Sequence, residues 1–522
     1  MKSFQPKEWI IILSFSFIAF FIHGYQFAVS DQEIFIPYIL KSATPSLFLG
    51  DALFNQSSVH LSIFYPLVGL LTKFFDIQII FFIGYLIFQF AFFTGIYRLS
   101  KILLKNERLA YFSLLPFLLP KFIGGTATQT FDLFFGYRSV GVIFLIFFLS
   151  FLLEHRYAKS LIVASVGTLF HPASIVPSVL NVFALYLLNS KSKTKDCLKI
   201  ISASLLLAVS SYIVLGKNFF YTIFSKNEIW YSIIKFRDAY VFTSTWQLLG
   251  WAAFFIYIVL VVVFLNELKK DIRYFVKTIC LVALAVFLIN AILLEVLRFP
   301  GFAQFQLVRS ITPVVYIALA ISPLFLTFKN KILRILGLFA FIFLSLNLFY
   351  FFLIMTTLFI VARLATNNKS QSDLSKYHLY LISTIILTLY FFLNLTSYSD
   401  LQEKIQFPKK ISEWISLQKW VLQNTDVSAK ILTPPASTGF RIFSQRPIVG
   451  DIKDGAVVIY SRDYAYYWDN LMRNLKDYDS FHDQDYIHLN RLYNFNYVIT
   501  DSQNKLNFKL MYKNEKFSVY KI

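Results

Sequence analysis

Two acidic residues follow directly after the first apolar segment of the chain, in the tetrapeptide Ser30-Asp31-Gln32-Glu33. The apolar segment runs from about Trp9 to Val29, which is the length that crosses a bilayer, so the two carboxylates lie where the chain leaves a membrane. Carboxylates at such a place are costly unless water, a partner or a substrate receives them. A carboxylate can also take a proton from a hydroxyl group as a general base. We therefore predict Asp31 and Glu33 as catalytic residues, with Asp31 first.

The alternative role for these acids is structural. Asp31 could begin the helix that follows, because Asp side chains cap the first amides of helices. The negative charge of Glu33 would then stabilise the same helix, because it lies near the positive N-terminal end of the helix dipole.

Basic residues and histidines are spread over the other segments that we expect on the same side of the membrane. Arginine forks match phosphate oxygens, so several arginines with few carboxylates suit an anionic ligand. The residues predicted to bind a ligand are His60, Arg138, His171, Arg237, Arg298 and Arg309. The arginines could instead extend to lipid headgroups, and His171 could be a satisfied polar group at a helix break.

The composition of the chain indicates that these residues belong to a membrane protein. The chain has 522 residues, of which 57% are hydrophobic and 15% charged, and apolar runs near twenty residues recur along it. The net charge of +20 is divided into short basic clusters between the apolar runs, such as Lys191 to Lys199 and Lys269 to Arg273. Such clusters are typical of cytoplasmic loops, so we predict no nucleic-acid partner.

The apolar runs predict an α-helical membrane domain of about 11–13 transmembrane helices over residues 1–398, with a first outer loop at 30–76. The N-terminus is predicted inside, as an uncleaved anchor. Leu161 to Leu188 is predicted to break at His171-Pro172, because proline disfavours helix at the residue before it. Leu109 to Gly124 is predicted to span the membrane, Ile335 to Val361 is either one long span or a hairpin, and His378 to Leu395 is the last span.

Residues 399–522 are less apolar and predict a small extracytoplasmic α/β domain. Ile411 to Gln423 has the apolar spacing of an amphipathic helix. The predicted strands are Ala429 to Thr433, Pro447 to Val449, Tyr497 to Thr500 and Lys516 to Tyr520.

Motifs of soluble enzymes are missing from the sequence: it has no P-loop, no dinucleotide-binding glycine pattern, no zinc spacing and no nucleophile elbow. Cys197 and Cys280 form no metal spacing. We therefore predict no cofactor, and any chemistry must come from scattered residues that the fold brings together.

The pattern resembles the GT-C class of integral-membrane glycosyltransferases. The resemblance rests on Ser30-Asp31-Gln32-Glu33 after the first span, on the stretch with His60 and Pro66, and on the many spans before an outer C-terminal domain. Leu169-Phe170-His171-Pro172, Thr433-Pro434-Pro435 and Phe440-Arg441 are similar to elements of uncharacterised bacterial members.

The resemblance implies a function. Members carry an acidic catalytic base in the first outer loop, which falls on Asp31 here, with Glu33 second. The implied donor is a polyprenyl-phosphate-linked sugar, the implied acceptor a glycan, lipid or protein outside the cytoplasm, and the implied location the inner (cytoplasmic) membrane of a bacterium. Most members need no metal.

Two other functions stay open on the sequence. The chain could be a non-catalytic scaffold of an envelope assembly complex, or a polysaccharide polymerase or ligase. An enzyme predicts that Asp31, His171 and the arginines meet in one cavity, whereas a scaffold predicts that they scatter.

Overall fold

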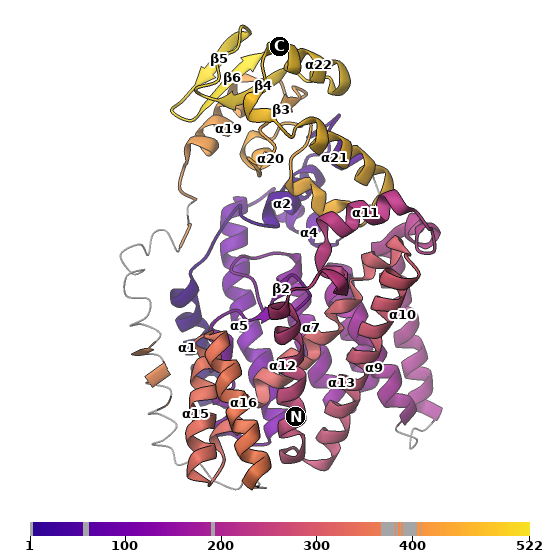
Figure 1. The fold of residues 1–522 in the computed structure, drawn as a ribbon, viewed down its shortest axis with the longest axis vertical. Coiled ribbons are helices and arrows are strands. Elements are labelled where there is room, and N and C mark those ends of the chain that lie inside the picture. Colours follow the sequence, from indigo (N-terminus) through magenta and orange to yellow (C-terminus); the bar gives the residue numbers. More distant parts are fainter. Residues whose placement is uncertain are drawn as a thin grey trace.

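The computed structural model describes residues 4–55, 62–188, 194–366, five positions between 382 and 389, 405–407 and 409–522. These residues form a helical bundle that carries a strand-containing domain at one end (Figure 1). His60, part of the basic cluster at 191–199 and most of the predicted last span at 378–395 lie outside the described residues.

The bundle is that of a polytopic membrane protein. Six helical segments of the described ranges are long and apolar enough to cross a membrane. They are α1 (Pro6–His23), α5 (Ile77–Leu104), α12 (Leu248–Phe264), α13 (Lys270–Ala291), the segment Pro300–Leu326 around α14 (Thr312–Ile321), and α16 (Phe349–Thr366). Shorter apolar helices join them: α7 (Tyr137–Leu153), α8 (Tyr157–Phe170), α9 (Pro172–Leu188) and the middle of α10 (Thr194–Thr222).

Proline decides where several of these helices end. The predicted break at His171 is confirmed, since α8 ends at Phe170 and α9 begins at Pro172.

Two other predicted segments have different outcomes. The Ile335 to Val361 stretch is a hairpin of α15 (Lys331–Ser345) and α16. The prediction of one span over Leu109 to Gly124 is wrong. That stretch contains α6 (Glu107–Phe112), the short helix η1 (Leu115–Leu118) and the strand β1 (Phe122–Ile123), because Pro116 and Pro120 interrupt the helix.

Basic residues gather at the end of the bundle away from the strand-containing domain. At this end Arg98 of α5 pairs with Glu154 after α7 (3.2 Å), and Lys101 pairs with Glu8 of α1 (2.6 Å). Arg363 of α16 pairs with Glu267 after α12 (2.7 Å). These contacts join the basic ends of helices far apart in the sequence.

The C-terminal domain is a four-stranded sheet with helices packed against it. The strand order is β3 (Ile431–Leu432), β4 (Tyr497–Asp501), β6 (Phe517–Lys521) and β5 (Lys509–Lys513), with β3 parallel to β4 and the other pairs antiparallel. The helices are α19 (Glu413–Asn424), α20 (Phe440–Ser444), α21 (Arg462–Asn474) and α22 (Asp483–Tyr493). The predicted α/β character is confirmed, although Pro447 to Val449 contributes a single bridge and β5 was not predicted.

A buried ion-pair network fixes this domain on the bundle. Arg441 of α20 donates to both carboxylate oxygens of Asp51 (2.7 and 3.0 Å), which precedes the short helix α3 (Ala52–Asn55). Its Nη1 donates to one oxygen of Asp454, and Nη2, which also contacts Asp51, donates to the other (2.8 Å each). All three side chains are at most 3% exposed. The network therefore determines how the C-terminal domain sits over the first loop.

Candidate functional site

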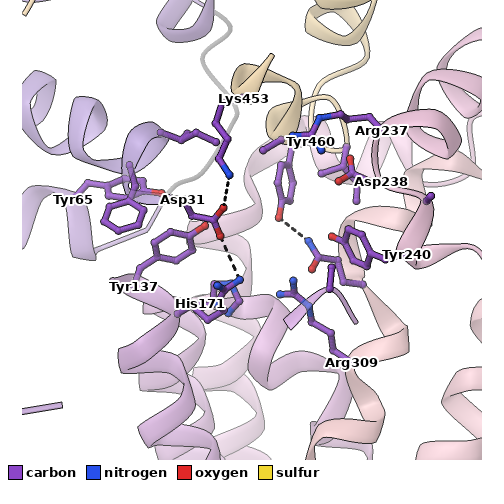
Figure 2. Close-up of a pocket in the computed structure, with 18 residues that line it drawn as sticks. Asp31, Tyr65, Tyr137, His171, Arg237, Asp238, Tyr240, Arg309, Lys453 and Tyr460 are labelled. Carbon is purple, nitrogen blue, oxygen red and sulfur yellow. Dashed lines mark hydrogen bonds and ion pairs between the residues drawn. The ribbon is translucent and has the colours of Figure 1, made fainter. Parts of the chain in front are cut away.

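A cavity of about 380 Å³ lies between the helical bundle and the C-terminal domain. The start of α2 (Gln32–Ala43), the start of α7 and the α8–α9 break form one wall. The end of α11 (Glu228–Arg237) and the short helix η7 (Leu307–Ile311) form the other, and the short helix η10 (Lys453–Val457) closes the top. Figure 2 shows Asp31, Tyr65, Tyr137 and His171 facing Arg237, Asp238, Tyr240 and Arg309 across it.

Asp31 reaches the cavity from the N-cap position of α2. The structure describes every residue of α2, and the Asp31 side chain accepts no hydrogen bond from its backbone amides. The capping role therefore does not apply. Instead Oδ2 lies 3.3 Å from Arg138 Nη1. Oδ1 lies 3.3 Å from Lys453 Nζ (Figure 2). Ser30 just before it has a φ of +53°, which a non-glycine residue adopts at some cost and which is common at functional sites.

Charge keeps Asp31 ionised. Burial alone would raise the pKa of its carboxyl, but Arg138, Lys453 and Arg309 outweigh burial and hold the pKa below its ordinary value. The side chain is still one third exposed, so a substrate in the cavity can reach it. Asp31 is therefore a carboxylate at neutral pH.

Arg138 and His171 lie beside Asp31 on the same wall. Arg138 donates to both oxygens of Asp132 (2.7 and 2.8 Å), which orients its guanidinium toward Asp31. His171 sits at the break between α8 and α9, where its Nδ1 lies 2.6 Å from Ser174 Oγ. Pro172 thus creates the break that turns a histidine into the cavity.

The opposite wall carries Arg237, Gln306 and Arg309. Gln306, at a φ of +48° before η7, donates from Nε2 to the Tyr460 hydroxyl of the C-terminal domain (3.0 Å). Arg309 is 8% exposed, and its guanidinium lies 6.0 Å from the centre of the Tyr240 ring. This wall therefore presents two guanidinium groups and one amide.

Several polar atoms of this wall are buried without a hydrogen-bond partner among the described residues. They are Arg237 Nε, Asp238 Oδ2, Gln306 Oε1 and Arg309 Nε. A buried polar group without a partner costs free energy that a bound ligand or water can recover. Four such atoms around one cavity indicate a site for a polar ligand, and the two guanidinium nitrogens among them favour an anionic group on it.

Asp238 differs from Asp31 in its protonation. Burial, with a smaller contribution from the charge of Asp31, raises the pKa of the Asp238 carboxyl to about 7 against the opposing charges of Arg237 and Arg309. The cavity therefore holds one ionised acid on one wall and one acid that is largely protonated below neutral pH on the other. Such a division of pKa values between two carboxyl groups is typical of active sites.

Arg298 does not line the cavity in which we expected it to meet Asp31, and Glu33, the second catalytic candidate, does not line it either. Arg298, which has a φ of +54°, pairs with Glu228 (3.4 Å), and both side chains are more than half exposed. Glu33 accepts a hydrogen bond from Thr438 Oγ1 (2.7 Å), and burial raises the pKa of its carboxyl. Glu33 therefore contacts the C-terminal domain. His60 lies outside the described residues.

Sequence reasoning missed Lys453 and Tyr460, which the C-terminal domain supplies, and Asp238, Tyr240 and Gln306. Asp238 directly follows Arg237 in the sequence, but only the arginine was predicted to bind a ligand. Nothing in the sequence indicated that η10 would lie over Asp31.

Within the described ranges, no group of three or more His, Cys, Asp or Glu side chains is placed to hold a metal ion. The chemistry that this cavity can perform on its own is proton removal by Asp31 and stabilisation of negative charge by Arg237 and Arg309.

One protein family and one solved structure illustrate what this chain is similar to. A family described as a domain of unknown function (DUF6798) matches residues 412–473, a segment that includes Arg441, Lys453 and Tyr460. The oligosaccharyltransferase AglB from the archaeon Archaeoglobus fulgidus, solved with an inhibitory peptide and a dolichol-phosphate, shares 13% sequence identity and a TM-score of 0.44. That match covers 96% of this chain and 70% of AglB. No curated protein matches the chain. Similarity at this level fixes neither activity nor substrate, so function must be inferred from the cavity.

Proposed function

We propose that the chain is a membrane glycosyltransferase that moves a sugar from a polyprenyl-phosphate lipid to an acceptor hydroxyl outside the cytoplasm of a bacterium. The observation that carries the proposal is the cavity itself. It places an ionised carboxylate opposite two arginines whose Nε atoms lack a hydrogen-bond partner among the described residues. In a non-catalytic scaffold we would not expect Asp31, His171 and these arginines to line one cavity.

The proposed reaction is a single displacement. The acceptor oxygen forms a bond to the anomeric carbon while the bond from that carbon to the phosphate oxygen breaks. The proton of the acceptor hydroxyl passes to Asp31, and the phosphate leaves with the bonding electron pair as a polyprenyl phosphate. Arg237 and Arg309 stabilise the charge that grows on this phosphate, which is the usual role of guanidinium groups near a leaving phosphate.

Each wall has a separate task in this proposal. The acceptor lies against Asp31, Arg138 and His171, and the donor phosphate lies against Arg237 and Arg309. Tyr65, Tyr137, Tyr240 and Tyr460 line the space between, where their rings and hydroxyls suit a sugar.

The distribution of charge supports the proposed side of the membrane. Lysine and arginine residues gather at the bundle end opposite the cavity, and such residues favour the cytoplasmic side. We therefore assign the cavity and residues 399–522 to the extracytoplasmic side, and residues 1–398 to the membrane domain. Lys453 makes the C-terminal domain part of the active site in this assignment.

The test is transfer of label from a lipid-linked donor. The purified full-length protein, in nanodiscs, is incubated with radiolabelled polyprenyl-phosphate sugars and membranes that provide acceptors. We expect label to move from the lipid to an acceptor with at least one donor. No transfer from any such donor, together with copurification of a stable envelope partner, would favour the scaffold.

A further inference from the structure

A second cavity, of about 840 Å³, lies at the basic end of the bundle, opposite the proposed active site. Its long sides are aliphatic: Val259 and Val262 come from α12, and Ile360 and Leu364 come from α16. Val262 and Leu364 are 60% and 79% exposed, so the cavity opens on the side of the bundle that faces lipid. It is therefore a groove between two spans.

One end of this groove is polar and carries more positive than negative charge. It contains Asn266, Glu267, Arg273 and Arg363. Arg363 Nη2 pairs with Glu267 Oε1 (2.7 Å), and Arg273 Nη2 donates to the carbonyl oxygens of Asn266 (2.7 Å) and Leu268 (3.2 Å). This end therefore holds two guanidinium groups and one carboxylate, which pairs with Arg363.

Each guanidinium group has one nitrogen atom that makes no hydrogen bond among the described residues, although the Arg363 guanidinium also lies over the Phe264 and Phe328 rings (5.9 and 5.0 Å to their centres). Arg273 Nε and Arg363 Nη1 are buried and have no hydrogen-bond partner within the described part of the chain. Leaving a charged donor unsatisfied beside hydrocarbon is costly, so an anion at this point would stabilise the protein.

We propose that this groove binds an anionic phospholipid of the surrounding bilayer, with its phosphate at Arg273 and Arg363 and one acyl chain along the valine, isoleucine and leucine side chains. Charge complementarity selects the headgroup, and the aliphatic walls select the chain. Basic pockets between spans on the cytoplasmic side bind anionic headgroups in this way. The site is separate from the proposed active site and does not depend on its chemistry.

The experiment measures lipid retention by native mass spectrometry of the purified full-length protein. The protein is given equal amounts of phosphatidylglycerol and phosphatidylcholine with identical acyl chains. We expect wild-type protein to retain phosphatidylglycerol, and Arg273→Gln to lower that retention by about tenfold, the usual size of one lost charge-assisted hydrogen bond. Val262→Trp should reduce binding of both lipids, because its indole fills the groove from an exposed position.

Lys331→Gln is the matched control, because it removes one exposed positive charge at the same end of the bundle but outside the groove. It should leave retention unchanged. Equal retention of the two lipids by wild-type protein would overturn the proposal, as would an Arg273→Gln protein that binds like wild type. Stronger binding of free polyprenyl phosphate than of phosphatidylglycerol would also overturn it. So would a Val262→Trp protein with unchanged lipid binding, since another part of the chain would then occupy the groove.

Discussion

Replacing Arg441 by methionine should loosen the C-terminal domain from the helical bundle. The guanidinium is 3% exposed and makes four hydrogen bonds to Asp51 and Asp454. Methionine replaces the aliphatic part of the arginine side chain but leaves two carboxylates buried near each other without a cation. Removing one partner of a buried ion pair costs about 3–5 kcal/mol, and here two carboxylates lose their partner, so we expect the upper part of that range.

A loss of this size changes the docking equilibrium by more than about a hundredfold. Hydrogen exchange is the suitable assay, because it reports the local opening of the segments that carry Asp51 and Asp454. Both segments should lose protection in Arg441→Met protein, whereas the buried helix α14 should keep it. Lys453, adjacent to Asp454, should then leave Asp31 and transfer activity should fall with docking.

Arg462→Met is the control, because Arg462 is a half-exposed arginine of the same domain that pairs only with Asp463 (3.4 Å) among the described residues. Such surface pairs contribute about 0–1 kcal/mol. The reasoning is refuted if Arg441→Met changes the free energy of local opening no more than Arg462→Met does.

Three further predictions concern the walls of the cavity. Arg309→Gln should weaken donor binding by about tenfold or more, since it removes a charge-assisted contact to phosphate, while Arg473→Gln on the exposed face of α21 should not; titration with a fluorescent polyprenyl phosphate measures both. Donor binding should weaken as pH rises through about 7, because Asp238 then ionises beside the anionic phosphate, and Asp238→Asn should remove this dependence. Lys453→Gln should raise the pKa of Asp31 toward its ordinary value, because one of the cations that holds it down is lost, and the acidic limb of the pH–rate profile should move to higher pH.

Local features of the sequence were sufficient to predict where Asp31 and His171 lie at the ends of helices in the bundle. Pro172 ends a helix by simple sterics, so the position of His171 followed from the sequence. Asp31 stood out because a carboxylate at the end of an apolar run must have a use or a partner. Its actual partners, Arg138 and Lys453, come from segments that are more than a hundred and more than four hundred residues away.

The sequence could not distinguish Arg309 from Arg298. Both follow α13 in a stretch of short helical turns, in which Gln306 and Arg298 itself have a positive φ. One guanidinium is buried in the cavity and the other is exposed beside Glu228. Lys453 and Tyr460 were equally hidden, because their position depends on the Asp51–Arg441–Asp454 network, in which no pair can be deduced from spacing.

The most direct measurement compares Asp31→Asn with wild-type protein in the transfer assay. The amide keeps the shape of the carboxyl group but cannot take the proton of the acceptor hydroxyl. We expect the rate of transfer to fall by about 10²-fold or more, the usual contribution of a positioned base, with donor binding nearly intact. Asp463→Asn, the same change at an exposed aspartate of the C-terminal domain, should transfer at the wild-type rate. Full activity in Asp31→Asn would contradict the assignment of Asp31 as the base.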